Sequence, residues 1–105
     1  MFKLRLLALA GLLLLQACAT NTPDPAARIL GSWESRVGEF TVVTTYSESE
    51  VSIDDHDPLP YVLEDNRLII DGDQISARLL SFPGRNEMVQ TEPMTGTTHR
   101  YERRP

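Results

Sequence analysis

Cysteine is nearly absent from this 105-residue chain, which contains only Cys18. One thiol cannot form an internal disulfide, so a disulfide-stapled framework is excluded. Histidine is scarce too, with two in the chain, and no serine stands in the Gly-x-Ser-x-Gly pattern of a nucleophile elbow. Because no catalytic triad is recognisable, we expect no enzymatic activity and no cofactor.

The chain has one long hydrophobic run, close to its first residue. Lys3 and Arg5 precede the uncharged apolar residues 6–15, and the small Ala17 follows them. A positive flank, a short apolar core and a small residue at the cleavage site are the parts of a secretory signal peptide. We therefore predict that residues 1–17 are removed. The alternative is an uncleaved spanning anchor, although such a helix needs about 20 apolar residues.

The end of this segment, Leu15-Gln16-Ala17-Cys18, resembles the lipobox of bacterial lipoproteins. The resemblance implies that Cys18 becomes the acylated N-terminus and anchors the chain to a membrane, which also accounts for the lone thiol. Stable anchoring takes more than one acyl chain, as such lipoproteins carry. The next residue is Ala19 and not Asp, which resembles lipoproteins sorted to the outer membrane, facing the periplasm.

Basic residues are outnumbered, with 10 Lys and Arg against 15 Asp and Glu. Loss of Lys3 and Arg5 with the signal peptide leaves 8 basic residues and a net charge of −7. Nucleic-acid binding requires basic patches, so we expect no nucleic-acid partner. An acidic domain also stands off an anionic membrane surface.

Residues 18–28 join the predicted anchor to the rest of the chain. After Cys18 they are small and polar, they contain Pro23 and Pro25, and they show no hydrophobic period. This composition predicts a flexible, disordered tether. A short helix over 25–30 is also compatible with the sequence, with Asp24 as its cap and Pro25 in its first position. The folded domain is predicted to span residues 29–105.

Within this domain the hydrophobic pattern has a period of two. Short β-branched and aromatic segments alternate with turns rich in Gly, Pro, Asn and Asp. The strands are expected at about 31–36, 39–46, 51–54, 61–64, 67–71, 74–82, 87–92 and 97–103. In the sixth strand, Ile75, Ala77 and Leu79 share one face and Arg78 lies on the other. Because tight turns connect only antiparallel neighbours, we predict an all-β fold, a small up-and-down barrel of about eight strands.

The first strand begins Leu30-Gly31-Ser32-Trp33, which resembles the Gly-x-Trp opening of lipocalin-type (calycin) barrels. The resemblance implies that Trp33 closes one end of the barrel under a basic residue from the last strand. Arg103 suits that role as a cation–π partner if Tyr101 points inward, since the two share a face. The alternative is that Trp33 is plain core. Eight strands enclose only side chains or one small ligand.

Two sets of residues are candidates for binding. Tyr101 and the aromatic side chains of Phe40, Tyr46 and Tyr61 either contact a ligand or partner or fill the barrel. The second set is the dense acidic cluster, which either binds a divalent cation weakly or is a solvated loop. It consists of Asp54, Asp55, His56 and Asp57. The other histidine, His99, is equally compatible with a hydrogen-bonded structural role.

These observations lead to two functional hypotheses. The first is a membrane-anchored envelope lipoprotein whose barrel binds a protein partner or a small apolar ligand. The second is a periplasmic inhibitor or immunity lipoprotein directed against a hydrolase. An open apolar cavity of a few hundred Å³ favours the first. A packed interior with one protruding loop favours the second, and carboxylates converging on a histidine in a cleft favour an enzyme.

Overall fold

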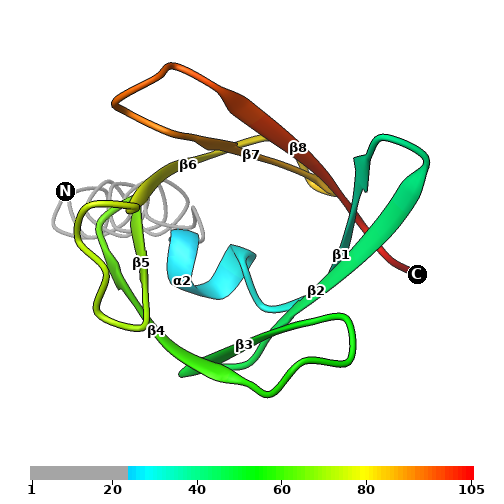
Figure 1. Cartoon of the computed structure of the whole chain (residues 1–105), viewed down its shortest axis with the longest axis horizontal. Coiled ribbons are helices and arrows are strands. Elements are labelled where there is room, and N and C mark those ends of the chain that lie inside the picture. The colour runs from blue at the N-terminus through cyan, green and yellow to red at the C-terminus, as the bar shows by residue number, and fades with distance from the viewer. Residues whose placement is uncertain (1–23) are drawn as a thin grey trace, which may run out of the picture.

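The computed structural model describes residues 24–105, so the predictions for residues 1–17, for Cys18 and for residues 19–23 of the tether lie outside the described part of the chain. These residues form the predicted all-β barrel: eight antiparallel strands in consecutive order, closed by pairing of the first with the last (Figure 1). The strands are β1 (Gly31–Val37), β2 (Phe40–Tyr46), β3 (Glu50–Ile53), β4 (Leu59–Glu64), β5 (Arg67–Ile70), β6 (Arg78–Gly84), β7 (Glu87–Thr91) and β8 (Thr98–Arg103).

The period-two pattern explains which side chains fill the barrel. In the β1–β2 pair Trp33 lies opposite Thr44, and both are buried, while their neighbours in sequence are more exposed. The same alternation buries Met88 and Gln90 on β7. The barrel core therefore draws side chains from nearly every strand. Its buried members are Ile29, Trp33, Tyr46, Val51, Tyr61, Leu68, Leu80 and Met88.

The prediction for the sixth strand was wrong about the residue at which the strand begins and about which of its side chains face the barrel interior. β6 begins at Arg78 and not at residue 74, and residues 71–77 form a turn-rich connection. Asp73 Oδ1 accepts hydrogen bonds from the backbone N–H groups of Ile75 (3.1 Å) and Ser76 (3.2 Å). These local bonds compete with the strand ladder. As a result Ile75 is 81% exposed, and the inward face of β6 carries Leu80 and Arg78.

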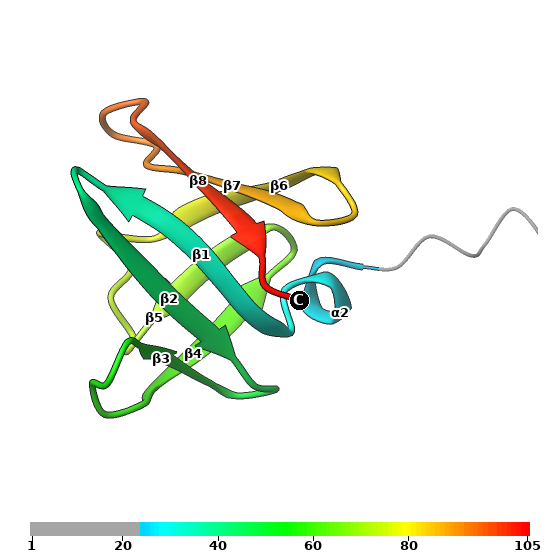
Figure 2. The same cartoon turned by 90° about the vertical axis from the view of Figure 1, so that its right-hand side faces the viewer.

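A short helix, α2 (Pro25–Arg28), precedes the barrel. Asp24 caps it, because its side chain accepts from the backbone N–H of Ala27 at 3.1 Å, and Pro25 occupies the first turn. These residues belong to the segment predicted as tether, yet the helix lies across one end of the barrel (Figures 1 and 2). Ile29, which follows it, is fully buried. Among residues 24–105, no helix has the length and apolar character to cross a bilayer.

Candidate functional site

The end of the barrel beneath α2 is closed by the residues predicted to close it. The Arg103 guanidinium carbon lies 4.2 Å from the centroid of the Trp33 ring. Its Nη1 and Nη2 donate to the carbonyl oxygens of Leu30 and Arg28, each at 2.7 Å. Trp33 Nε1 donates to the carbonyl oxygen of Ile29 at 2.9 Å. The cation–π contact and these bonds fasten the segment after α2 over the core.

Gly31 belongs to the same closure for a steric reason. Its φ of +112° is a conformation that L side chains rarely adopt. A Cβ at this position would lie 3.0 Å from Arg103 Nη1, closer than ordinary van der Waals contact. Glycine therefore allows the guanidinium to pass against the backbone where β1 begins.

The opposite end of the barrel is open. Because the strands run up and down, the connections β1–β2, β3–β4, β5–β6 and β7–β8 all lie at this end (Figure 2). Two adjoining cavities of about 690 and about 370 Å³ occupy it. They share four lining residues, which are Thr44, Ile53, Arg78 and Tyr101.

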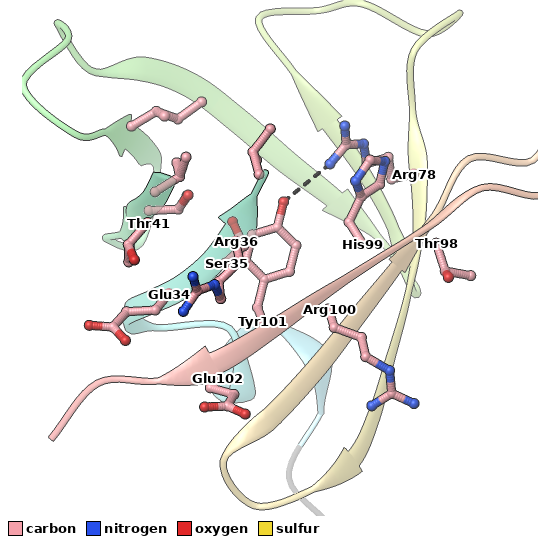
Figure 3. Close-up of a pocket in the computed structure, with 14 residues that line it drawn as sticks. Glu34, Ser35, Arg36, Thr41, Arg78, Thr98, His99, Arg100, Tyr101 and Glu102 are labelled. Carbon is pink, nitrogen blue, oxygen red and sulfur yellow. Dashed lines mark hydrogen bonds between the residues drawn. The ribbon is translucent and has the colours of Figure 1, made fainter. Parts of the chain in front are cut away.

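The larger cavity owes its shape to incomplete pairing of the first and last strands. β1 and β8 pair only at Trp33–Arg103 and Glu34–Glu102. Beyond Glu34 the two strands separate, and residues of both line the cavity between them (Figure 3). The smaller cavity extends into the barrel, where one wall is aliphatic. That wall consists of Val51, Ile53, Leu59, Leu68 and Ile70.

A chain of polar side chains crosses the wall opposite these aliphatic residues. Arg78 Nη1 donates to Gln90 Oε1 at 3.0 Å and to the Tyr101 hydroxyl at 3.3 Å, the latter drawn in Figure 3. Gln90 Nε2 in turn donates to the Tyr46 hydroxyl at 3.0 Å. Burial keeps water from the phenolate and raises the pKa of Tyr46 to about 12. The inner part of this network is therefore neutral.

Arg78 carries the network's only positive charge. The ion pairs within residues 24–105 are Arg67–Glu64, His99–Glu92 and Arg104–Glu34, and none includes Arg78. The hydrogen bond from His99 Nε2 to Glu92 (2.7 Å) lowers the pKa of that carboxyl. The charge of Arg78 lowers it further, acting from beyond ion-pair distance.

The structure divides the four aromatic residues predicted to contact a ligand or fill the barrel. Tyr46 and Tyr101 line the cavity. Tyr61 packs edge-on against Tyr46, with 5.4 Å between ring centroids, and donates its hydroxyl proton to the Ser47 carbonyl on the closed side. Phe40 is 76% exposed and does not belong to the core. The alternative that Phe40 fills the barrel is therefore wrong.

Phe40 instead belongs to an apolar rim around the open end. The exposed large hydrophobic side chains of residues 24–105 number eight, and six of them stand on or beside the open-end connections. These six, the rim residues, are Val37, Phe40, Ile53, Leu59, Ile75 and Met94. The closed-end connections, residues 47–49, 65–66 and 85–86, contain only polar and charged residues.

The acidic loop between β3 and β4 is organised by its own hydrogen bonds. Asp54 Oδ1 accepts from the backbone N–H of Val43 at 2.9 Å, and His56 Nδ1 lies 3.0 Å from the Ile53 carbonyl oxygen. In the described part of the chain, no three His, Cys, Asp or Glu side chains converge as metal ligands would. Asp55 and Asp57 are exposed. The loop thus contributes to the fold, with Asp54 tying it to β2.

Arg78, Gln90 and Thr44 are site residues that sequence reasoning missed. Arg78 was placed on the opposite face from the apolar residues of its strand. The alternation Arg78, Leu80, Phe82 contains the correct signal, but a competing apolar alternation runs through Ile75, Ala77 and Leu79. Gln90 alternates with Met88 in the same way, and both are buried. The pattern of β7 therefore indicates that the Gln90 side chain faces the barrel interior.

No protein-family model, curated protein or solved structure matches this chain.

Proposed function

We propose that the chain is a membrane-anchored envelope lipoprotein whose barrel, lipocalin-like and without catalytic activity, binds a small apolar ligand through its open end. The observation that carries this proposal is the contrast between the two ends. Trp33, Arg103 and α2 close one, whereas cavities of about 690 and about 370 Å³ open at the other. Sites for small molecules are concave pockets of about 300–1,000 Å³, mostly apolar with a few polar groups. The smaller cavity fits this description through its aliphatic wall, whereas most of the larger cavity is lined by polar and charged side chains.

The cavity lining supports a binding role more than a chemical one. His99 Nε2 pairs with Glu92, and His56 Nδ1 pairs with the Ile53 carbonyl. Among residues 24–105, neither histidine is hydrogen-bonded to a hydroxyl that it would activate as a general base. The aliphatic wall of the smaller cavity instead offers apolar surface, and burying such surface favours binding by about 25 cal/mol per Å².

The position of α2 supports attachment of an anchored barrel at its closed end. Asp24 lies at the closed end, six positions after Cys18. Six extended residues reach at most about 20 Å. A lipid anchor on Cys18 therefore attaches the barrel at its closed end, and the open end lies on the side opposite the attachment. In the outer membrane predicted from Ala19, that end faces the periplasm.

Filling the cavity tests this proposal. Ile53 lines both cavities, whereas Val62 is exposed on the outer wall of β4. We expect the purified chain 19–105 to bind Nile red, a neutral apolar dye, and Ile53→Trp to weaken that binding about tenfold or more. Val62→Trp adds the same side chain outside the barrel and should leave binding unchanged. Equal binding by both variants would place the dye elsewhere and count against the proposal.

The rim residues favour a second candidate, an inhibitor or immunity lipoprotein against a hydrolase. Six exposed apolar side chains stand on or beside the connections at one end, and a large exposed apolar surface marks a protein contact site. A pull-down of the barrel from envelope extract discriminates the two. Recovery of one stoichiometric hydrolase, whose activity falls when the barrel is added, supports this candidate. Recovery of lipid without protein supports ligand binding.

A further inference from the structure

We propose that Arg78, together with the Tyr101 hydroxyl, is a built-in site for the anionic headgroup of the ligand, which is therefore an amphiphile with a carboxylate or phosphate head and an apolar tail. This inference rests on the proposed function, because it assigns a chemical class to the ligand of the same cavity. It follows from the placement of Arg78, which lines both cavities and faces into the barrel at the start of β6.

The guanidinium is held in place from one side only. Nη1 makes both of its hydrogen bonds, to Gln90 Oε1 and to the Tyr101 hydroxyl. Gln90 is itself 1% exposed and fixed by its bond to Tyr46. A guanidinium has five N–H donors, and Nε and Nη2 have no hydrogen-bond partner among residues 24–105. These are the donors that pair with the two oxygens of a carboxylate or phosphate.

Tyr101 adds a donor beside them. Its hydroxyl oxygen accepts from Arg78, so its own proton is left to donate, and it has no acceptor among the described residues. An anion seated against the outer donors of Arg78 can accept this proton's hydrogen bond as well. Two such donor groups on one headgroup make charge-assisted bonds, which are stronger than bonds between neutral groups.

The charges around the smaller cavity leave Arg78 as its single cation. Two carboxylates also line this cavity, those of Asp71 and Asp73. The Asp73 carboxylate is engaged by two backbone N–H groups, which lower its pKa. Neither is within ion-pair distance of Arg78. An entering anion therefore gains its main attraction from Arg78. It meets weaker, solvent-screened repulsion from Asp71 and from Asp73, whose lowered pKa keeps it ionised.

The opposite wall selects the rest of the ligand. Val51 and Leu68 are almost fully buried beneath the smaller cavity, and Ile70 and Leu59 continue that wall toward the rim. A headgroup on Arg78 directs an attached chain against these side chains. The cavity of about 370 Å³ admits a short or medium chain.

Matched ligands that differ only in the headgroup test the inference. Isothermal titration of the chain 19–105 should show decanoate or decyl phosphate binding about tenfold or more tightly than decanol, because hydrogen bonds to charged groups exceed neutral ones. Decyltrimethylammonium should bind no better than decanol. The tighter of the two anions identifies the headgroup. The Arg78 Nε–H resonance in NMR spectra should shift on addition of that anion.

Variants assign the effect to Arg78. Arg78→Gln should bring the anion's affinity down to that of decanol for the same variant, so that the preference for the anion is lost. Tyr101→Phe should reduce the preference in part. Arg85→Gln is the matched control, because it removes an equal charge at the closed end. Circular dichroism confirms that each variant is folded.

The outcomes separate the two proposals. If decanol and both anions bind equally, or if Arg78→Gln keeps the preference, the anion site is refuted while ligand binding stands. If none of the four compounds binds, and Nile red does not bind either, the proposed function itself fails.

Discussion

The Arg103 guanidinium lies 4.2 Å from the centroid of the Trp33 ring and donates to the backbone carbonyls of Arg28, the last residue of α2, and of Leu30. The Arg103 side chain, at the end of β8, thus contacts the residue before β1, the core residue Trp33 and the last residue of α2. Arg103 is opposite Trp33 in the β1–β8 register, so the contact also marks where the barrel closes.

Replacing Arg103 should therefore destabilise the barrel strongly. Arg103→Gln loses a cation–π contact and two charged hydrogen bonds, and we expect about 2–4 kcal/mol in the free energy of unfolding. Urea denaturation followed by Trp33 fluorescence measures it, since the chain has one tryptophan. Arg104→Gln removes only the half-exposed pair with Glu34 and should cost about 0.5 kcal/mol or less. Similar losses in both variants would contradict this account of the closure.

Replacing Gly31 should lower the stability of the barrel, because a side chain there would be strained in its backbone conformation and would collide with Arg103. Its φ is +112°, and an added Cβ would meet Arg103 Nη1 at 3.0 Å. We expect Gly31→Ala to cost about 2 kcal/mol or more. Gly38→Ala also places a side chain at positive φ, +64°, but in open space, and should cost about 1 kcal/mol. In an Arg103→Ala background the Gly31 penalty should shrink measurably, because the clash is gone.

The closed end was predictable in part from strand periodicity and strand order. A period-two pattern places Tyr101 and Arg103 on one face, and a strand count brings the last strand beside the first. The pairing of Arg103 with Trp33 came from the resemblance to lipocalin-type barrels, which implies a basic residue of the last strand over the tryptophan. The eight strands were predictable because each is bounded by turn residues in the sequence.

The open end was not predictable, because its key choice is between two apolar alternations. Ile75, Ala77 and Leu79 form one apolar face of the segment, and Leu80 with Phe82 form the opposite one. The Asp73 side chain decides between them by holding the backbone of Ile75 and Ser76 out of the strand. That bond depends on local turn geometry, which hydrophobic periodicity does not encode. Arg78 consequently turns inward, and the polar site forms around it.

The predicted anchor makes a separate prediction about processing. If Cys18 is acylated, Cys18→Ser should yield an unprocessed precursor without acyl chains, since no thiol remains to be modified. Metabolic labelling with a fatty acid, together with the mass of the product, measures both effects. Asp24→Ala, which removes the cap of α2, should leave labelling unchanged. A Cys18→Ser product that is cleaved at the same site and stays membrane-bound would falsify the lipoprotein assignment.

Tyr46 should make the folded barrel sensitive to alkaline pH. Burial raises its pKa to about 12, against 10.0 for an exposed tyrosine. Below pH 10 the phenol is neutral in both states and the stability is unaffected. Between about 10 and about 12 the unfolded chain loses a proton that the folded barrel keeps, so the free energy of unfolding falls as the pH rises. At about 1.4 kcal/mol per pH unit the loss approaches about 2–3 kcal/mol.

Chemical denaturation across this range should show the fall, and Tyr46→Phe should remove most of it. Tyr46→Phe also takes an acceptor from Gln90, so its stability is lower at neutral pH, and the comparison rests on the slope with pH rather than the level. Tyr61, whose pKa burial also raises, contributes in the same direction, and Tyr61→Phe should leave the larger part of the slope. An unchanged alkaline slope in Tyr46→Phe would mean that the Tyr46 hydroxyl is in contact with water. The Arg78–Gln90–Tyr46 chain would then not be a closed inner wall of the cavity.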